Sequence, residues 1–309
     1  MKFTIYQESR PGKRPNNEDR LAHCYSRDAL LMVVADGMGG HYYGEIAAQI
    51  AVQTMVEAFQ REAKPDIPDP FMFLQKSMMN AHRAIVDFTN THNLNDSPRT
   101  TCVACIIRNN IAYWAHAGDS RLYLMRDGKV ITHTRDHSRV QLLMDEGRIN
   151  EAQAAVHPER NKVYSCLGGP QTPEISFSRK TPLEAGDVVM LCTDGLWGVL
   201  PGDVMSVALK SENLMQAVPM LLGQADIRGG PSADNLSIVV VRWEDSYVEP
   251  GASAPSASSA ISTQTMSRET VTTKLDAFGR NPKYKTELSE EEIERAIEEI
   301  RSTIQKYSK

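Results

Sequence analysis

The stretch Leu31-Met-Val-Val-Ala-Asp36-Gly37-Met38-Gly39-Gly40-His41 holds the pattern that decides the fold. An apolar run of the length of a buried strand stops at a carboxylate, and the glycine that follows lets the backbone turn sharply. The pattern recurs at Val188-Val-Met-Leu-Cys-Thr-Asp194-Gly195. Both copies predict a buried strand that delivers an aspartate to the end of a sheet.

Two further aspartates stand at the ends of strand-like runs. Asp119 follows the apolar run 111–118, and Asp234 opens the run 236–241. A carboxylate at the end of a buried strand must be solvated, paired or bound to a cation. Several such carboxylates brought together favour hard metal ions held by oxygen.

Composition limits the classes of protein to which the chain can belong. Its 309 residues, 41% of them hydrophobic, suit one large domain with an appendage. A formal net charge of -5 argues against a general nucleic-acid binder. No apolar signal core opens the chain, and no apolar run approaches the ~20 residues that span a bilayer. We therefore expect a cytoplasmic protein that binds neither nucleic acid nor membranes.

Strand-like and helix-like segments alternate over residues 1–245. Ala47, Ala51 and Met55 recur every fourth residue and predict a helix after the Asp36 turn, and a second apolar stripe predicts another helix over residues 74–88. The pairs 109–110 (Asn-Asn) and 127–128 (Asp-Gly) favour tight hairpins between antiparallel strands. This arrangement predicts α+β layers rather than a doubly wound parallel sheet.

The composition changes after Trp243. The Ser-, Ala- and Thr-rich character of residues 246–286 predicts a flexible linker. The stretch Leu288-Ser-Glu-Glu-Glu292 has the pattern of a capped helix start and predicts an amphipathic helix over residues 287–309. A lone helix of this length is marginal in water, so it would either dock on its own domain or bind a partner. The sequence favours neither alternative.

The stretch Arg14-Pro-Asn-Asn-Glu18-Asp19 adds two carboxylates and one guanidinium to this set. Arginine presents a planar fork that binds phosphate through two hydrogen bonds. Carboxylates alone suit Mg²⁺ or Mn²⁺, whereas carboxylates with an arginine suit a phosphate ester presented to those metals.

Six short motifs follow one another along the chain. They are Arg14-x-x-x-Glu18-Asp19, Asp36-Gly37-Met-Gly-Gly40, Gly118-Asp119-Ser120-Arg121, Asp136-His137-Ser138, Thr193-Asp194-Gly195-Leu-Trp197 and Asp234-Asn235-x-Ser237. In this order they resemble the metal-dependent protein serine/threonine phosphatases, the protein phosphatase 2C-like family, and above all its bacterial branch. The likeness runs from residue 3 to about residue 243 and leaves out the tail. It implies a catalytic domain over residues 1–245 with a four-layer α/β/β/α sandwich, two central antiparallel sheets flanked by helices.

The resemblance also implies which residues hold metal ions. Two divalent cations, Mn²⁺ or Mg²⁺, would be bridged by Asp36. The Glu18 side chain and the Gly37 carbonyl would complete one site, and Asp194 and Asp234 the other. A weaker third cation would bind Asp119 together with Asp194.

Three residues have catalytic roles in this interpretation. Asp36 places the two cations, Asp19 would hold a metal-bound water, and Arg14 would grip the phosphate. The chain would hydrolyse phosphoserine and phosphothreonine by attack of a metal-activated water, without a phospho-enzyme. Phosphorylated proteins would be its substrates, and a bacterial Ser/Thr kinase would be its counterpart.

Three positions depart from the family pattern. Met38 stands where animal relatives carry a histidine proposed as general acid, and a thioether cannot donate a proton. Arg99 replaces a glycine expected before Thr100, and Ser165 stands where many bacterial relatives have arginine. Ser165 lies in residues 145–169, which resemble the family's flap, a segment beside the metal site. For His41 and His137 the sequence favours structural roles.

Two alternatives to a protein phosphatase remain open in the sequence. A non-catalytic adaptor of the same fold could bind phosphoproteins; the tail favours it, although no expected metal carboxylate is missing. A two-metal phosphoesterase acting on small molecules or nucleic acid is the other, and the net negative charge weakens its nucleic-acid version.

Overall fold

The computed structural model describes residues 1–38, 43–210, 213–245 and 260–275. One sheet consists of β1 (Lys2–Arg10), β7 (Arg121–Arg126), β8 (Lys129–His133), β11 (Val188–Cys192), β12 (Leu236–Trp243) and β13 (Ile261–Ser262). The other consists of β2 (Asp19–Tyr25), β3 (Ala29–Met38), β4 (Arg99–Thr100), β5 (Cys102–Arg108), β6 (Ile111–Ala117), β9 (Ser176–Phe177), β10 (Thr181–Pro182) and β14 (Thr272–Leu275).

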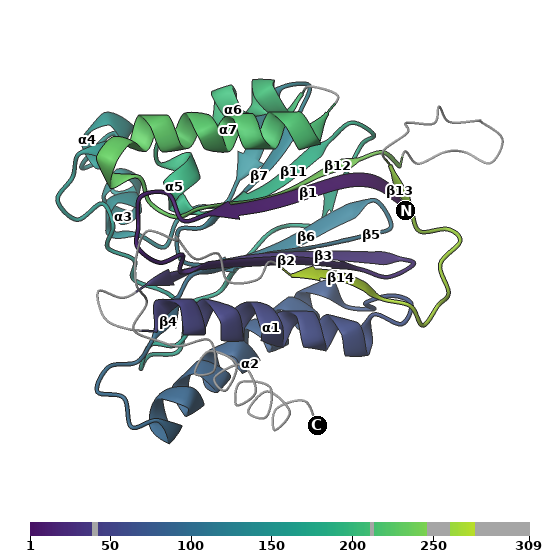
Figure 1. Ribbon diagram of the computed structural model, residues 1–309, viewed down its shortest axis with the longest axis horizontal. Coiled ribbons are helices and arrows are strands. Elements are labelled where there is room, and N and C mark those ends of the chain that lie inside the picture. Colours follow the sequence, from purple (N-terminus) through teal and green to yellow (C-terminus); the bar gives the residue numbers. More distant parts are fainter. Residues whose placement is uncertain (39–42, 211–212, 246–259, 276–309) are drawn as a thin grey trace.

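The first sheet has the order β13-β1-β12-β11-β7-β8, and the second has the order β10-β6-β5-β3-β2-β14, with β4 beside β3 and β9 beside β6. The strands pair in antiparallel fashion throughout both sheets as described. The sheets lie face to face with helices outside each (Figure 1), which confirms the predicted α/β/β/α sandwich.

Helices cover both outer faces of the sandwich (Figure 1). The second sheet is covered by α1 (Gly44–Glu62) and α2 (Pro70–Thr91), and the first by α5 (Asp194–Trp197), α6 (Gly202–Leu209) and α7 (Leu214–Gly229). The short helices α3 (Arg139–Asp145) and α4 (Glu151–Ala155) lie at one end, and a 3₁₀ turn (Gly230–Ser232) precedes β12. The helices α1 and α2 confirm the two that the apolar spacing predicts. Within the described ranges, no helix has both the length and the apolar character needed to cross a membrane.

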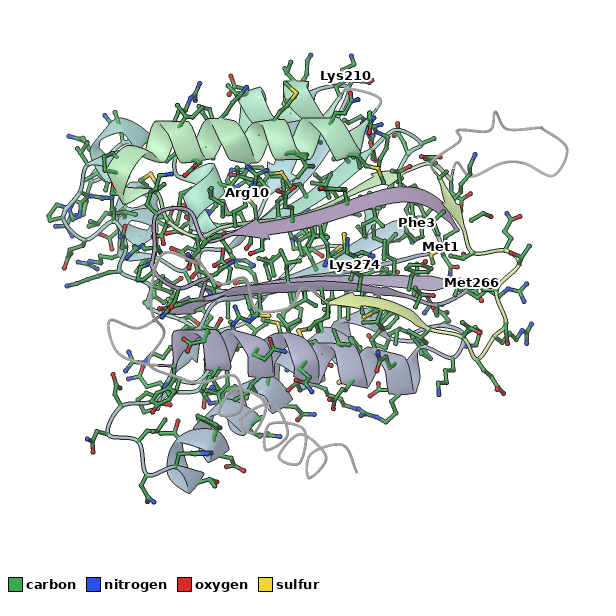
Figure 2. The ribbon with its side chains drawn as sticks, viewed as in Figure 1. Met1, Phe3, Arg10, Lys210, Met266 and Lys274 are labelled. Atoms are coloured by element: carbon green, nitrogen blue, oxygen red, sulfur yellow. The ribbon has the colours of Figure 1, made fainter. Side chains whose placement is uncertain are left out.

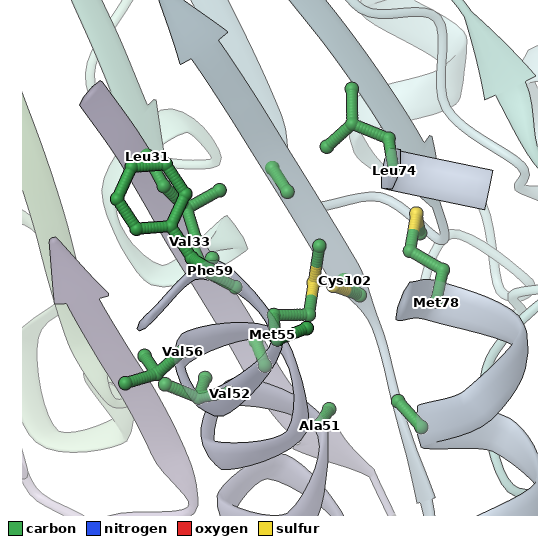
Figure 3. Packing of buried hydrophobic residues seen from close by; sticks show 14 of the residues in the cluster. Leu31, Val33, Ala51, Val52, Met55, Val56, Phe59, Leu74, Met78 and Cys102 are labelled. Carbon is green, nitrogen blue, oxygen red and sulfur yellow. Dashed lines mark hydrogen bonds between the residues drawn. The ribbon is translucent and has the colours of Figure 1, made fainter. Parts of the chain in front are cut away.

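Three apolar layers hold the four structural layers together. In β3, Leu31 and Val33 face α1 and α2, whereas Leu30 and Met32 face the other sheet, because side chains alternate along a strand. Figure 3 shows the layer under the helices, where Met55 of α1 packs among such residues. A strand buried on both faces needs a continuous apolar sequence, which is why 29–35 reads as one run.

Both predicted hairpins are present. Asn109 and Asn110 have φ of 49° and 57° between β5 and β6, and Asp127 and Gly128 have φ of 52° and 75° between β7 and β8. Positive φ at both central residues is what a two-residue hairpin turn requires, and Asn, Asp and Gly tolerate it.

Residues 260–275, here called the closing segment, lie inside the stretch 246–286 for which the sequence predicts a flexible linker, and they contain two short strands. The strand β13 pairs with β1 at the edge of one sheet, and β14 pairs with β2 at the edge of the other. Figure 2 labels Met1 and Phe3 at the same end of the molecule as Met266 of this segment. Strands of two and four residues carry too short a pattern to be predicted from sequence, since their partners stabilise them.

A buried threonine anchors the closing segment between the sheets. The Thr263 side chain is 0% exposed. Its hydroxyl accepts a hydrogen bond from the Met1 amine at 2.9 Å and donates to the Arg27 carbonyl at 2.7 Å. Residues 246–259, and the helix predicted over 287–309, lie outside the described part of the chain.

Candidate active site

The fold gathers the predicted carboxylates at one end of the sandwich. Asp19 opens β2 and Asp36 lies near the end of β3, and the two are direct partners in the antiparallel pair. Asp119 follows β6, Asp194 opens α5 directly after β11, and Asp234 precedes β12. Like charges directly opposite each other in a sheet are destabilising. The cluster therefore needs protons or cations to balance it.

The pKa values of these aspartates reflect the crowding. Burial, followed by the charges of Asp19 and Asp194, raises the pKa of Asp36 well above its ordinary range. Burial and the charge of Asp194 raise the pKa of Asp119 well above its ordinary range in the same way. Burial and Asp234 raise the pKa of Asp194 to about 6, although a hydrogen bond from Asp36 opposes the rise. Five of the predicted site residues thus lie within electrostatic reach of one another.

Asp19 is the most deeply buried of them, at 2% exposure. Its Oδ2 accepts a hydrogen bond from the Thr193 hydroxyl at 2.9 Å, whereas its buried Oδ1 has no hydrogen-bond partner among the described residues. Burial raises the pKa of Asp19 to about 7, against hydrogen bonds from Ser237 and Thr193. A buried carboxylate oxygen without a donor is suited to receive a water or a cation.

Glu18 and Gly37 meet the start of α1. The Gly37 N–H donates to the Glu18 carbonyl at 3.2 Å. A Cβ on Gly37 would lie 2.3 Å from the Gly44 carbonyl oxygen, and a Cβ on Gly44 would lie 2.1 Å from Glu18 Oε2. Burial, with the charge of Glu45, raises the pKa of Glu18 to about 7. The two predicted ligands lie together: a side chain at 37 would clash with the backbone of Gly44, and one at 44 would displace the Glu18 carboxylate.

Arg14 is held by one of the predicted metal ligands. Its Nε donates to Asp234 Oδ1 at 2.8 Å and its Nη2 to Asp234 Oδ2 at 2.6 Å. The two side chains are 55% and 36% exposed, so the pair lies at the mouth of the site. The structure thus places Arg14 beside the cluster, with its fork engaged by a carboxylate rather than free.

Sequence reasoning missed the residues that hold these groups in place. Asn235 donates to the carbonyls of Pro11 and Asn16 at 3.0 and 2.9 Å and accepts from the Glu18 N–H at 2.9 Å. Asn235 thereby holds in place the loop that contains Arg14 and Glu18. The only sequence signal was its place in the motif after Asp234.

Two threonines hold Asp36 in a similar way. The Asp36 N–H donates to Thr101 Oγ1 at 3.0 Å, and the Asp36 carbonyl accepts from the Thr101 N–H at 2.8 Å and from Thr100 Oγ1 at 2.9 Å. These bonds fix the backbone from which the carboxylate projects.

The three departures from the family pattern lie near this end of the fold. Arg99 is the direct partner of Met38 in the β3–β4 pair, and its Nη2 lies 3.2 Å from Asp96. A Cβ on Gly169 would lie 3.7 Å from Arg99 Nε, so the arginine lies against the base of the flap. Ser165 is 5% exposed and donates to the Glu174 carbonyl at 2.8 Å. The short serine side chain is satisfied by this buried hydrogen bond. The longer, charged side chain of an arginine would have to extend to solvent.

The donor set fits hard divalent cations. Among the described residues, no group of three His, Cys, Asp or Glu side chains is arranged to hold a metal ion. Asp234 bonds Arg14, and Asp36 bonds Asp194. The available donors are nonetheless all oxygens. They repel one another, and one of them, Asp19 Oδ1, is unpartnered. Oxygen-rich acidic sites are what Mg²⁺ and Mn²⁺ prefer.

Two packed sheets carry carboxylates and an arginine at one end. This arrangement is typical of a class of metal-dependent phosphohydrolases. The family model of protein phosphatase 2C matches residues 8–218 of the chain. The chain belongs to the protein phosphatase 2C family.

Its relatives are bacterial serine/threonine phosphatases. Serine/threonine phosphatase stp of Listeria monocytogenes is 30% identical over 231 residues, which are 74% of this chain and 90% of stp. Serine/threonine protein phosphatase PstP of Mycobacterium tuberculosis is 33% identical over 227 residues, 74% of this chain but only 42% of PstP. The chain thus matches less than half the length of that relative.

Solved structures agree with these sequence matches. The crystal structure of M. tuberculosis PstP/Ppp has a TM-score of 0.69 at 32% identity and covers 79% of this chain and 100% of that one. The catalytic domain of PstP in complex with two manganese ions has a TM-score of 0.66 at 30% identity, over 79% and 100% of the two chains. The family and fold predicted from the motifs are confirmed.

Proposed function

We propose that this protein hydrolyses phosphoserine and phosphothreonine in proteins and needs two divalent cations, Mn²⁺ or Mg²⁺. The observation that carries the proposal is the cluster of buried carboxylates around Asp36 with Arg14 at its mouth, in a chain whose relatives are named serine/threonine phosphatases. The PstP structure with two manganese ions supports the choice and number of the cations.

We assign the ligands as the motifs imply. Asp36 would be shared by both cations, with Glu18 and Gly37 on one side and Asp194 and Asp234 on the other. When bound, such cations activate a water as nucleophile and offset the charge that develops on the phosphoryl oxygens. Asp119, whose raised pKa is caused partly by Asp194, would hold a weaker third cation with it.

The chain's own side chains orient the reactants. Asp19 Oδ1 is buried and unpartnered, so it can accept a hydrogen bond from the attacking water. The guanidinium of Arg14 lies partly exposed at the mouth and is bonded to Asp234, so it would have to exchange this carboxylate for two phosphate oxygens to bind the substrate. Met38 has no proton to give. In this proposal the departing Ser or Thr oxygen would take its proton from water.

The finer assignments belong to the proposal as well. A bacterial Ser/Thr kinase would add the phosphates that this enzyme removes, and the reaction would take place in the cytoplasm. The helix predicted over 287–309 would bind a partner or its own domain. The catalytic domain would extend to residue 275 rather than 245, because the closing segment belongs to both sheets.

The test is hydrolysis of a phosphothreonine peptide by metal-stripped protein with and without added Mn²⁺, beside the Asp36→Asn variant. We expect turnover that needs Mn²⁺ and falls more than ~100-fold in the variant, because the shared ligand is lost. Nucleotides and small phosphate esters in the same assay separate a protein phosphatase from a general phosphoesterase. Turnover that survives both chelation and the substitution would contradict the proposal.

A further inference from the structure

The motif Asp136-His137-Ser138 has no role in the chemistry described so far, yet its three residues are 5%, 3% and 1% exposed. Asp136 takes two hydrogen bonds at 2.8 Å from Arg121, whose guanidinium lies 3.5 Å from the ring centre of Trp197. The indole N–H of Trp197 donates to the Asp119 carbonyl at 2.9 Å. The motif therefore reaches the backbone of a proposed metal ligand through Asp136.

His137 forms hydrogen bonds with both the carbonyl and the N–H of Gly118, the residue before Asp119. The His137 N–H donates to the Gly118 carbonyl at 2.9 Å, and the Gly118 N–H donates to His137 Nδ1 at 3.3 Å. Gly118 has φ of +109°, and a Cβ there would lie 2.7 Å from the Thr101 side chain. The turn thus has one conformation and one permitted residue, and it sets the direction in which the Asp119 carboxylate leaves the backbone.

The imidazole of His137 uses both nitrogens. Because Nδ1 accepts from Gly118, Nε2 carries the proton and donates to Ser176 Oγ at 2.9 Å. The ring stacks on His116 at 4.6 Å between centroids. Burial, and secondarily His116, lowers the pKa of His137 to about 4, so the ring stays neutral and Nδ1 stays an acceptor at neutral pH.

The same residue joins the end of the flap, residues 145–169. The Tyr164 N–H donates to the His137 carbonyl at 2.8 Å, and the Tyr164 ring lies 5.4 Å from the imidazole. Ser138 and Val163 form an antiparallel bridge. Residues 163–164 of the flap are thus bonded to the His137–Ser138 segment, and Gly118 is bonded to His137 as well.

We propose that His137 is a positioning residue that aims the Asp119 carboxylate and couples the flap to the weakly bound third cation. The inference rests on the proposed function, since it takes Asp119 as a ligand of that cation. A displacement of the flap at residues 162–164 moves the His137 backbone. The Nδ1–Gly118 bond passes that displacement to Asp119.

Two substitutions separate this role from simple filling of the core. The Oδ1 of asparagine is as many bonds from Cα as Nδ1 of histidine, whereas Nε2 of glutamine matches histidine Nε2. His137→Asn therefore keeps the acceptor for Gly118, and His137→Gln keeps only the bond to Ser176. Both remove the aromatic ring and its stacking, so they cost similar packing.

The experiment is calorimetric titration of Mn²⁺ into the metal-stripped full-length variants, with thermal unfolding as a check on folding. His137→Gln should weaken the weakest Mn²⁺ site at least ~10-fold and leave the tighter sites unchanged, as for other residues that orient a ligand. His137→Asn should stay within ~3-fold of the wild type. Equal affinities for the weakest site in folded His137→Gln and wild type would overturn the inference, and so would equal losses in the two variants.

Asp119→Asn serves as the reference for the metal assignment. Loss of the weakest site in Asp119→Asn supports the assignment, so that unchanged binding in His137→Gln then counts against the coupling alone. Retention of every site in Asp119→Asn would overturn the assignment of Asp119, and the role of His137 with it. Measured turnover of the phosphothreonine peptide adds a second readout: the His137→Gln variant should recover at high Mn²⁺, because only cation affinity is weakened.

Discussion

Asp19 and Asp36 face each other across neighbouring strands, which a sheet tolerates only if one charge is removed or balanced. The protein retains both carboxylates and surrounds them with hydrogen-bond donors. Thr193 is the central one: its hydroxyl donates to Asp19 Oδ2 at 2.9 Å and accepts from the Ser237 N–H at 3.1 Å. A single side chain thus ties β11 and β12 to the carboxylate at the start of β2.

Thr193→Val keeps the shape of this side chain and removes its hydrogen bonds. We expect a loss of about 1–3 kcal/mol in the free energy of unfolding, because two buried groups lose their partner. The melting temperature should fall by ~2–4 °C for each kcal/mol in a domain of this size, and turnover should fall with it. The matched control is Thr181→Val, whose hydroxyl bonds the Arg179 carbonyl at the surface. Equal effects of the two substitutions would count against a special role for Thr193.

Arg14 has a counterpart in Lys13, which makes the adjacent ion pair with Asp226 at 3.2 Å. Arg14→Ala should lower kcat/KM for a phosphothreonine peptide ~10–100-fold, the size expected for charge-assisted hydrogen bonds to phosphate. Arg14→Lys should recover little of this, because an ammonium lacks the planar fork. Steady-state kinetics of these variants beside Lys13→Ala measure the effect. A similar loss in Lys13→Ala would mean that general positive charge at the mouth, not the guanidinium, is what matters.

The sequence indicated Asp36, Asp119 and Asp194 because each follows a local run of apolar residues, and Asp234 because it precedes one. It could not predict how they are held. The Arg14–Asp234 pair joins residues 220 positions apart, and Asn235 bonds Pro11 and Asn16 from 224 and 219 positions away. No periodicity or turn chemistry encodes such contacts, since they exist only once β1 and β12 have paired.

At the scale of elements, the two hairpins and the helices α1 and α2 were predictable because local chemistry determines them. Turn residues that accept positive φ and an apolar stripe at helical spacing act within a few residues. The closing segment is the opposite case. Its strands follow a low-complexity stretch, and only pairing with β1 and β2 gives them a structure.

The closing segment gives a prediction about the limits of the domain. A chain ending at residue 275 should unfold like the full chain, whereas one ending at residue 245 should be less stable by about 2–4 kcal/mol. The shorter chain loses burial of Ile261 and Val271 and the bonds of Thr263. Thermal unfolding of the three chains checks this. Equal melting temperatures for the chains ending at 245 and 275 would show that the segment adds nothing.

The molecule as a whole loses stability at its candidate active site. Three apolar layers fix both sheets, and this rigid frame holds carboxylates whose pKa values stand above their ordinary range. Stability and metal binding are therefore linked through protons. A cation bound by these carboxylates would replace the protons, remove the repulsion and stabilise the folded state.

The sign of the pH dependence follows from the raised pKa values. Asp19 and Glu18 titrate near pH 7, and Asp36 and Asp119 higher than their ordinary values, whereas in the unfolded chain all four titrate near 4. Between these limits the folded state binds more protons than the unfolded state, so stability falls as the pH rises. Burial lowers the pKa of His23 and His137 to about 4, which acts in the opposite direction, but only below the ordinary histidine value near 6.5.

Above pH 6.5 the carboxylates therefore dominate, and the metal-stripped protein should melt several degrees lower at pH 8 than at pH 6.5. Added Mn²⁺ should raise the melting temperature more at pH 8, since the ligands there have already lost the protons with which Mn²⁺ competes. Differential scanning calorimetry in chelator and in Mn²⁺ at the two pH values measures both effects. Asp36→Asn removes one titrating group and should flatten the dependence. A metal-stripped protein that gains stability over this interval would contradict the clustering of carboxylates as its cause.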